Sequence, residues 1–302
     1  MSSLLYRVLG LLLLTGGWGC KEKPAVVFQT DFGLKDGAVS AMKGVSKQVD
    51  PALQLFDLTH EIPAYNIWEA AYRLEQTLPY WPQGTVFVSV VDPGVGTQRK
   101  SIVAETTSGH FIVTPDNGTL SFLARSVGIK RVRLINEAIN RRQSSTDSYT
   151  FHGRDVYAFT AARLASGVIG FEELGPDYPV DSLVLIAYQQ PERRQDTIFG
   201  NIPVLDVQYG NLWTNIPDSL IKKAGWSKGD SLVLEVYHSD SLKHSGVYPL
   251  RNTFGEVPVG SGLLYYNSLM QISAAINEGN FASQFGLGSG PEWSVRLHKP
   301  SR

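Results

Sequence analysis

Apolar runs that alternate with segments of helical periodicity constrain the fold of this chain more than any other feature. The runs AVVFQT, LQLFDL and TVFVSVV, at residues 25–30, 53–58 and 85–91, have the length and β-branched content of buried strands. Between them, apolar residues at helical spacing predict one helix from Asp36 to Pro51 and another over residues 66–78. Elements in this order are typical of a parallel sheet with right-handed crossovers.

The rest of the chain predicts that this α/β region is followed by a β domain. Further strands are expected at 101–105, 111–114 and 131–135, and a helix is expected from Val156 to Ala165. The polar segment Gln189–Asp196 is typical of a linker, and short strands follow it, with one helix over residues 267–277. The predicted fold class is therefore α/β. A sandwich-like N-terminal α/β domain with a mainly parallel sheet (24–190) precedes a smaller β-barrel-like domain (197–298).

Composition excludes several classes of protein. With 302 residues, 43% hydrophobic and 18% charged, the chain can bury a large core, which excludes wholesale disorder. Lys and Arg total 27 against 28 Asp and Glu, so no basic field is available and no nucleic-acid partner is expected. The single cysteine, Cys20, excludes an intrachain disulfide and a thiolate zinc site.

The N-terminus has the pattern of an export signal. Residues 1–20 carry one charge, Arg7, ahead of a leucine-rich run too short to span a bilayer. Cys20 stands where such a signal would end, as in a bacterial lipoprotein, whose cysteine is acylated. We therefore assign residues 1–23 to a signal and short tether, with the membrane contacted only through a lipid on Cys20. The expected location is the cell envelope, or the cytoplasm if the signal is not used; the alternatives are an uncleaved anchor and a mis-assigned start codon.

Polar residues gather where the predicted parallel strands end. They are Asp31, Asp36, Asp57, His60, Asp92, Arg99 and Asp116. Because ligands bind at the carboxyl ends of parallel strands, we expect at least four carboxylates in one crevice, where Asp31 could accept hydrogen bonds from both hydroxyls of a ribose. Each aspartate also has a structural alternative, since Asp before a helix is commonly an N-cap. Asp31, Asp57, His60, Asp92 and His152 could instead be ligands of a hydrolytic metal centre.

Two further segments contain candidate site residues. His152, in the turn FHGRD at 151–155, is either a structural histidine or a general base or hydrogen-bond donor, and Gly153 would let a ligand approach the backbone. In the second domain, residues 206–215 alternate aromatic and amide side chains. Tyr209 and Trp213 could stack on a planar base while Asn211 reads its polar edge, or the segment is a β-hairpin with surface aromatics.

These blocks, taken together, resemble a known enzyme family. Six blocks occur in a fixed order along the chain: TDFG with Asp36, VDPGVGT with Arg99, TPDNG, FHGRD, D..YGN.WTNI and the Asn-Ser pair at 267–268. They are similar to the S-adenosyl-L-methionine (SAM) hydroxide adenosyltransferases, or SAM hydrolases, which share a fold with the SAM-dependent fluorinases and chlorinases. The resemblance covers about residues 25–290. It implies a homotrimer in which SAM lies between the N-terminal domain of one chain and the C-terminal, β-barrel-like domain of the next.

The resemblance also implies roles for individual residues. The family's Asp-Arg-His trio near the reacting carbon matches Asp92, Arg99 and His152. The substrate-binding positions match Asp31 for the ribose, Asp36 and Asp206 for the methionine ammonium, Tyr209 and Asn211 for the adenine side, and Ser268 for the methionine carboxylate. Fluorinases carry Tyr at the position of Asp92 and Ser at that of Gly153, which favours hydrolysis here. They carry Arg where this chain has Leu269, which leaves open how the methionine carboxylate is neutralised.

The implied reaction is hydrolysis of SAM to adenosine and L-methionine, with SAM as substrate and no cofactor or metal. A sulfonium releases neutral methionine without a general acid, so the difficulty is the nucleophile, because bulk water has a pKa of about 15.7. Arg99 and His152 could stabilise a hydroxide-like oxygen while Asp92 orients them and takes the proton. The alternatives are a SAM-dependent halogenase and a non-catalytic exported lipoprotein that binds SAM or adenosine.

Overall fold

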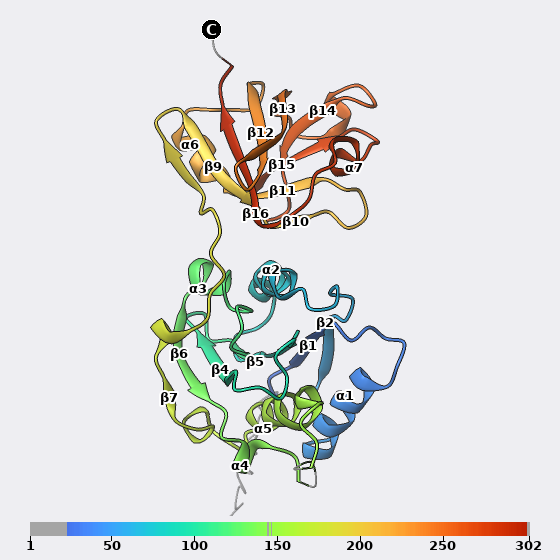
Figure 1. Cartoon of the computed structure of the whole chain (residues 1–302), viewed down its shortest axis with the longest axis vertical. Helices are drawn as coiled ribbons and strands as arrows, with labels where there is room; N and C mark the ends of the chain where they lie inside the picture. Colours follow the sequence, from blue (N-terminus) through green and yellow to red (C-terminus); the bar gives the residue numbers. More distant parts are fainter. Residues whose placement is uncertain (1–22, 144, 146, 301–302) are drawn as a thin grey trace, which may run out of the picture.

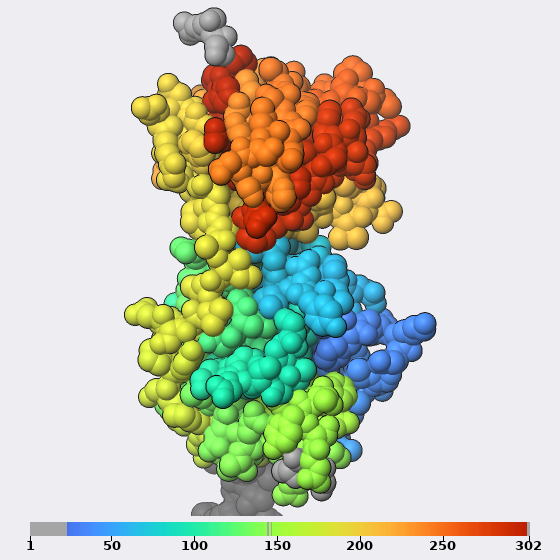
Figure 2. Space-filling view, in the orientation of Figure 1, coloured from blue at the N-terminus to red at the C-terminus, as the bar shows by residue number. Residues whose placement is uncertain are grey.

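The structure is a computed structural model that describes residues 23–143, 145 and 147–300. Figure 1 shows an N-terminal domain, blue to green, and a C-terminal domain, yellow to red, one above the other along the long axis. The space-filling view narrows where they meet (Figure 2). Cys20 and the rest of the predicted signal up to residue 22 lie outside the described residues. None of the helices within the described ranges combines the length and apolar character needed to cross a bilayer.

A seven-stranded sheet forms the centre of the N-terminal domain. Its strands are Val26–Thr30 (β1), Leu55–Thr59 (β2), Val86–Val90 (β3), Ser101–Thr106 (β4), Phe111–Pro115 (β5), Ile129–Leu134 (β6) and Asp177–Tyr178 (β7). The spatial order is β2-β1-β3-β5-β4-β6-β7. The first four strands pair in parallel, and the pairings β5-β4, β4-β6 and β6-β7 are antiparallel. The parallel core predicted from the alternation of strands and helices is confirmed.

Helices cover both faces of this sheet. They are Ala38–Val49 (α1), Ile67–Thr77 (α2), Leu123–Ser126 (α3), Glu137–Asn140 (α4) and Phe159–Ser166 (α5), and a π-helix over Gly153–Ala158 precedes α5. Alternate residues of β1 enter different cores: Phe28 packs with Met42 of α1, whereas Val27 packs in the same cluster as Leu74 of α2. The result is a three-layer α/β/α arrangement, with α1 and α5 on one face and α2 and α3 on the other (Figure 1).

Two antiparallel sheets form the C-terminal domain. The strands are Glu192–Arg194 (β8), Thr197–Ile202 (β9), Val204–Leu205 (β10), Leu212–Pro217 (β11), Ser231–His238 (β12), Ser241–Pro249 (β13), Gly262–Tyr266 (β14), Gln271–Ile276 (β15) and Gly290–His298 (β16), with helices Asp218–Lys223 (α6) and Phe281–Phe285 (α7). The sheet orders are β10-β11-β15-β14 and β13-β12-β16-β9-β8. One core lies between them, to which Leu234 of β12 and Ile272 of β15 both contribute. The predicted β domain is confirmed, as two sheets whose described strands do not close into one barrel.

Two elements differ from the sequence-based expectation. The second strand, expected to be buried, is the edge strand β2, and Phe56 in it is 40% exposed. The helix expected over 267–277 is a β-hairpin, in which the side chain of Asn267 accepts backbone N–H groups from Leu269 and Gln271 and β15 follows. Residues 272–276 are buried on both faces of the strand. The sequence therefore lacks the alternation of apolar and polar residues that would distinguish a strand from a buried helix.

An aromatic cluster joins the two domains. The indole N–H of Trp68, on α2, donates to the carbonyl of Pro203 at 2.8 Å. The Trp68 ring packs with Phe122 of the N-terminal domain, Val204 of the C-terminal domain and Tyr188 of the segment between them. The C-terminal domain is thereby held against the α2 face of the sheet, away from α1 and α5 (Figure 1).

Candidate active site

A cavity of about 250 Å³, named here the N-terminal cavity, lies where β1 and β3 end. Asp31 follows β1, Asp92 follows β3, and His152 stands at the start of the π-helix; all three line the cavity together with Phe32 and Tyr65. Parallel strands bring their carboxyl ends to one edge of the sheet, which explains why residues so distant in the sequence meet there.

Asp92 and Arg99 form a nearly buried ion pair across the turn after β3. The Arg99 Nε–H lies 2.9 Å from both Asp92 oxygens, and Nη2 also donates to Asp92 Oδ2. The two side chains are 5% and 12% exposed. Burial acts to lower the pKa of Arg99, but the hydrogen bond to Asp92 and the charge interactions with Tyr157, Asp92 and Glu137 together outweigh it, so the pKa is raised. Gly94 permits the close turn, because a Cβ there would lie 3.2 Å from the Arg99 side chain.

His152 extends this ion pair into a larger network. Its Nδ1 lies 3.0 Å from Arg99 Nη2, and its Nε2 lies 2.7 Å from Arg141 Nη2. Burial lowers the pKa of His152; the Glu137 carboxylate opposes this, and the two guanidinium groups add to it. The imidazole is therefore neutral at pH 7. The structure thus brings the predicted Asp92, Arg99 and His152 into direct contact.

Sequence reasoning missed Arg141 and Glu137. Arg141 directly follows α4, and its Nε–H lies 3.0 Å from Glu137 Oε2, four residues earlier. The spacing Glu-x-x-x-Arg, which places both side chains on one face of a helix, was the available signal. It is a weak signal, because the same spacing occurs on solvent-exposed helices, and only the packing of α4 beside the π-helix brings Arg141 to His152.

The loop after β2 holds Asp31 in position. The backbone N–H of Tyr65 donates to Asp31 Oδ2 at 2.9 Å, and Tyr65 itself has a left-handed φ of 68° and is 72% exposed. His60, at the start of the same loop, contacts the chain on both sides of Asp31, since its Nδ1 lies 2.8 Å from Thr30 Oγ1 and its carbonyl accepts the N–H of Gly33 at 2.8 Å. Tyr65 lines the N-terminal cavity, and no sequence motif indicated it.

The other strand-end carboxylates lie outside the N-terminal cavity. Asp36 lines an adjoining hollow of about 770 Å³ that shares Phe32, and its Oδ1 also accepts a backbone N–H two residues along, as a cap does. Asp57 pairs with Lys43, and Asp116 accepts the Tyr178 hydroxyl at 3.0 Å. The expectation of four carboxylates in one crevice is therefore wrong. No group of three or more His, Cys, Asp or Glu within the described ranges is arranged to hold a metal ion.

A tight loop between β10 and β11 places the candidate residues of the second domain. Asp206 Oδ1 accepts two backbone N–H groups of this loop, at 3.0 and 3.1 Å. Gly210, at φ 66°, allows the loop to pack closely, because a Cβ there would lie 2.1 Å from the Asn280 side chain. Tyr209 is 65% exposed and Asn211 is buried, and both line a cavity of about 800 Å³, named here the C-terminal cavity.

The remaining candidates lie apart from both cavities. Ser268 is exposed in the turn between β14 and β15, and neighbouring Leu269 packs against the interdomain cluster. Trp213 lies in β11 and packs in the same cluster, so it is not a surface aromatic. The residues that line the N-terminal cavity all belong to the first domain and those of the C-terminal cavity to the second, with none in common.

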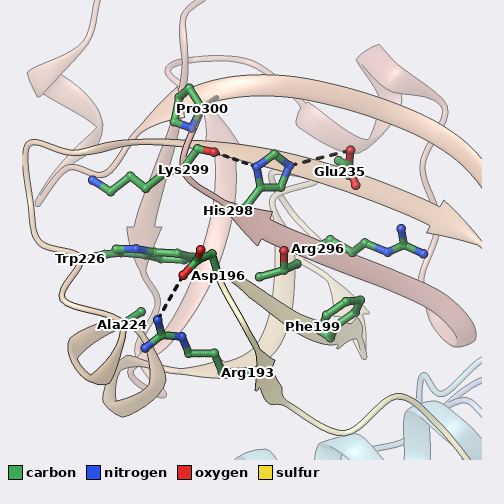
Figure 3. A pocket seen from close by; sticks show the side chains of 11 residues that line it. Arg193, Asp196, Phe199, Ala224, Trp226, Glu235, Arg296, His298, Lys299 and Pro300 are labelled. Atoms are coloured by element: carbon green, nitrogen blue, oxygen red, sulfur yellow. Dashed lines mark hydrogen bonds and ion pairs between the residues drawn. The ribbon is translucent and has the colours of Figure 1, made fainter. Parts of the chain in front are cut away.

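A further hollow, of about 630 Å³, lies in the C-terminal domain beside the last strand (Figure 3). Trp226 forms part of its wall, and three cationic side chains surround it. Those cations have partners: Arg193 lies 3.6 Å from Asp196, Lys299 lies 2.6 Å from Asp230, and Arg296 lies over an aromatic ring. Because its charges are satisfied locally and no candidate residue lines it, this hollow is not assigned to the site.

Known proteins match the same two domains. Family models described as the SAM hydroxide adenosyltransferase N-terminal and C-terminal domains match residues 26–175 and 200–294. Proteins named (R)-S-adenosyl-L-methionine hydrolase from Salinispora tropica and Methanocaldococcus jannaschii are 34% and 35% identical, over 90% and 72% of this chain and 97% and 75% of theirs. A fluorinase from Nocardia brasiliensis is 24% identical over 91% of this chain and 98% of its own. The crystal structure of an uncharacterized conserved protein from Thermotoga maritima matches with a TM-score of 0.81 and 30% identity, over 91% of this chain and 100% of that one.

Proposed function

The chain belongs to the SAM hydroxide adenosyltransferase family, and from this premise we propose that it hydrolyses SAM to adenosine and L-methionine. Relatives named as hydrolases are 32–35% identical to it, whereas the fluorinases are 24–26% identical. The difference in identity favours hydrolysis over halogenation. SAM is the substrate, and the reaction needs no cofactor.

The contact of Asp92, Arg99 and His152 beside the N-terminal cavity is the observation that carries this proposal. Asp92 and His152 line this cavity, and Arg99 contacts both of them. A carboxylate, a neutral imidazole and a guanidinium are the groups needed to hold a water molecule as it becomes a nucleophile. Because the pKa of His152 is lowered, the ring does not add a positive charge next to the sulfonium of SAM.

Hydrolysis then requires one displacement at the ribose C5′. The water oxygen forms a bond to C5′, the C5′–S bond breaks, and its electron pair returns to sulfur as neutral methionine leaves. Arg99 and His152 stabilise the oxygen while it carries developing negative charge, and Asp92 takes the water proton and passes it to solvent. Holding this oxygen in line with the C–S bond supplies further rate through proximity.

The substrate-binding roles remain those that the family resemblance implies. Asp31 lines the N-terminal cavity and would accept the ribose hydroxyls, and Asp36 in the adjoining hollow would lie near the methionine ammonium. Asp206 would also lie near the ammonium, and Ser268 near the carboxylate. Tyr209 and Asn211, in the C-terminal cavity, would contact the adenine.

Isotope labelling with the purified chain tests the reaction. Incubation with SAM in H₂¹⁸O should produce methionine and adenosine with one ¹⁸O at the 5′ hydroxyl, and Asp92→Ala should abolish both products. Asp57→Asn is the control, because Asp57 is a carboxylate in the neighbouring strand β2 that pairs with Lys43 outside the cavity. A 5′-halogenated product in chloride or fluoride would indicate a halogenase. SAM binding without any product would indicate a binding protein, and unchanged hydrolysis by Asp92→Ala would remove the trio from the mechanism.

The separation of the two cavities supports a homotrimer with sites at the subunit interfaces. Within one chain, the residues proposed for the ribose and for the adenine line separate cavities in different domains. A second chain that presents its C-terminal cavity to the N-terminal cavity of the first would join the two halves, and a closed ring of three chains would complete every site in this way.

Mixing two variants, each impaired in one half of the site and assayed at SAM far below the KM of the C-terminal variant, tests this assembly. Asp92→Ala impairs the N-terminal half, and the double variant Tyr209→Ala, Asn211→Ala impairs the C-terminal half. If each site combines halves from two chains, random mixed trimers regain about one quarter of the wild-type sites. If each site lies within one chain, mixing restores no activity. Sedimentation of the wild-type chain gives the number of subunits independently.

Export as a lipoprotein is proposed from the sequence of residues 1–23, with lipid on Cys20 as the only membrane contact. Mass spectrometry of the mature protein should find an acylated Cys20 as the first residue, and Cys20→Ala should move the protein out of the membrane fraction. An intact, unmodified N-terminus in the soluble fraction would instead place the enzyme in the cytoplasm, where the signal is not used.

A further inference from the structure

His152 lies between two carboxylate–guanidinium pairs rather than beside one. On its Nδ1 side, Arg99 is bound by Asp92; on its Nε2 side, Arg141 is bound by Glu137. The second pair is also largely buried, since the Arg141 side chain is 6% exposed, and its guanidinium lies 4.7 Å from the centre of the Tyr149 ring. Both ring nitrogens therefore face N–H donors.

Counting hydrogens limits the state of the ring. A neutral imidazole has one N–H and one lone pair, so it can accept from only one of the two guanidinium groups. An imidazolium has no lone pair and could accept from neither. The ring is therefore a neutral tautomer that accepts from one arginine and points its own N–H towards the other.

The need for acceptors is greater on the Arg141 side. The Arg99 guanidinium reaches the two Asp92 oxygens and Ser101 Oγ, the latter at 2.8 Å. Arg141 reaches only Glu137 and His152 in the described structure, and its buried Nη1 has no hydrogen-bond partner. A buried guanidinium that lost another acceptor would be left further unsatisfied, which is unfavourable. The shorter contact, 2.7 Å against 3.0 Å, is also the one to Arg141.

We propose that Arg141, held by Glu137, is a positioning residue that fixes His152 as the Nδ1–H tautomer, an inference that rests on the proposed hydrolysis. Nε2 accepts from Arg141, so the Nδ1–H and an Arg99 N–H approach one another with no acceptor between them. One oxygen atom at the cavity wall can accept from both. The pair of donors is thus arranged for the attacking water, whose proton passes to Asp92 as it adds to C5′.

Four charged side chains act on the protonation of His152: Arg99 and Asp92 on one side, Arg141 and Glu137 on the other. The guanidinium groups oppose a charge on the ring and the carboxylates favour it. Removing Arg141 should therefore raise the pKa of His152, and removing the charge of Glu137 should lower it further. Activity requires the neutral ring, so the acidic limb of the pH–rate profile should move to higher pH in the first case and to lower pH in the second.

Arg141→Met and Glu137→Gln test this pair of opposite shifts. Arg141→Met should lower kcat about tenfold to a hundredfold, with the KM for SAM changed less than about twofold. Arg141→Lys should recover part of the wild-type kcat, and its acidic limb should lie close to that of the wild type, because lysine keeps a cationic hydrogen-bond donor. Arg142→Met is the matched control, since it removes a guanidinium at the next residue, and it should leave the profile unchanged. Structural damage alone would not move the limb in opposite directions.

NMR of ¹⁵N-histidine-labelled protein shows which ring nitrogen of His152 carries the proton, and it does so without any reaction. The His152 resonances, assigned by their loss in His152→Gln, should show a protonated Nδ1 and an unprotonated Nε2 in the wild type. An Nε2–H tautomer, or shifts of the same sign in Arg141→Met and Glu137→Gln, would overturn the proposal. If Arg141→Met does not fold, the downward shift in Glu137→Gln decides it. These spectra need no SAM, so failure of the proposed hydrolysis is distinguishable from failure of this inference.

Discussion

The N-terminal and C-terminal cavities differ in how completely one chain organises them. Beside the N-terminal cavity, hydrogen bonds join Asp92 to Arg99, and His152 lies in direct contact with Arg99; all three side chains are largely buried. In the C-terminal cavity, Tyr209 is 65% exposed, and the side chain of Asp206, at the start of the same loop, is bound to the backbone of that loop. Buried, mutually bonded charges are positioned before substrate arrives, whereas an exposed aromatic face awaits a partner. We take the first as the reacting half and the second as the recognition half.

The largest effect should follow from Arg99→Met, which breaks the reacting half. Asp92 would remain as a buried carboxylate without its cation, so unfolding free energy should fall by about 3–5 kcal/mol. Loss of the oxyanion-stabilising donor should lower kcat about a thousandfold. Urea unfolding and SAM turnover measure the two effects.

Arg131→Met is the matched control for that variant. Arg131 also binds a carboxylate, Glu105, but its side chain is 41% exposed. Glu105 is itself nearly buried, but it keeps Lys130 as a second cation at 3.0 Å. Stability should therefore change by less than about 1 kcal/mol, and activity should not change. If Arg99→Met kept activity within about tenfold of wild type, the N-terminal cavity would not be the reacting half.

Asp31→Ala and Asn211→Ala compare substrate binding in the two halves. A charged acceptor of ribose hydroxyls contributes more than a neutral amide, so the KM for SAM should rise about tenfold to a hundredfold in Asp31→Ala and about twofold to tenfold in Asn211→Ala. Neither change should lower kcat by more than about threefold, since both residues act in binding. Steady-state kinetics measure this. A large loss of kcat in Asn211→Ala would contradict the division between the halves.

Gly153→Ser should have a smaller effect, confined to the reacting half. A Cβ at residue 153 would lie 3.2 Å from the Phe32 ring and 3.4 Å from the sulfur of Met42, so Phe32, which lines the cavity, must shift. Such overpacking should reduce stability by about 1–3 kcal/mol and kcat/KM severalfold. Gly44→Ser is the control, because a Cβ there meets nothing within 4 Å. An unaffected Gly153→Ser enzyme would show that Phe32 moves freely.

The smallest effect should be the contribution of His152 to pH-dependent stability. Its pKa is lowered in the folded protein, so the unfolded chain binds the proton first as the pH falls below about 6.5. The contribution of His152 to the free energy of unfolding is therefore complete above about pH 6.5. It decreases as the pH falls towards the pKa of His152 in the folded protein. Urea unfolding between pH 7 and 5 should show a steeper loss for the wild type than for His152→Gln. Parallel curves would mean that the ring titrates alike in both states.

Much of the reacting half was predictable because its residues stand at the ends of strands. The strands over 25–30 and 85–91 have strong local patterns, and the topology of a parallel sheet then brings Asp31 and Asp92 to one edge. The same rule wrongly placed Asp57 and Asp116 in the crevice, because it says which end of the sheet a residue occupies and not what its side chain contacts. Asp57 meets Lys43 and Asp116 meets Tyr178, and these partners depend on packing.

Local patterns in the sequence alone determined the order of elements, the α/β domain followed by a β domain, and the motifs that point to SAM. Periodicity, turn residues and motif spacing are properties of neighbouring residues, so they can be read without a fold. Only the tertiary structure decided that β2 is an edge strand, that residues 267–277 form a hairpin, and that Arg141 and Glu137 flank His152. Each of these depends on which distant segments pack together and on the surface that they bury, which no local pattern records.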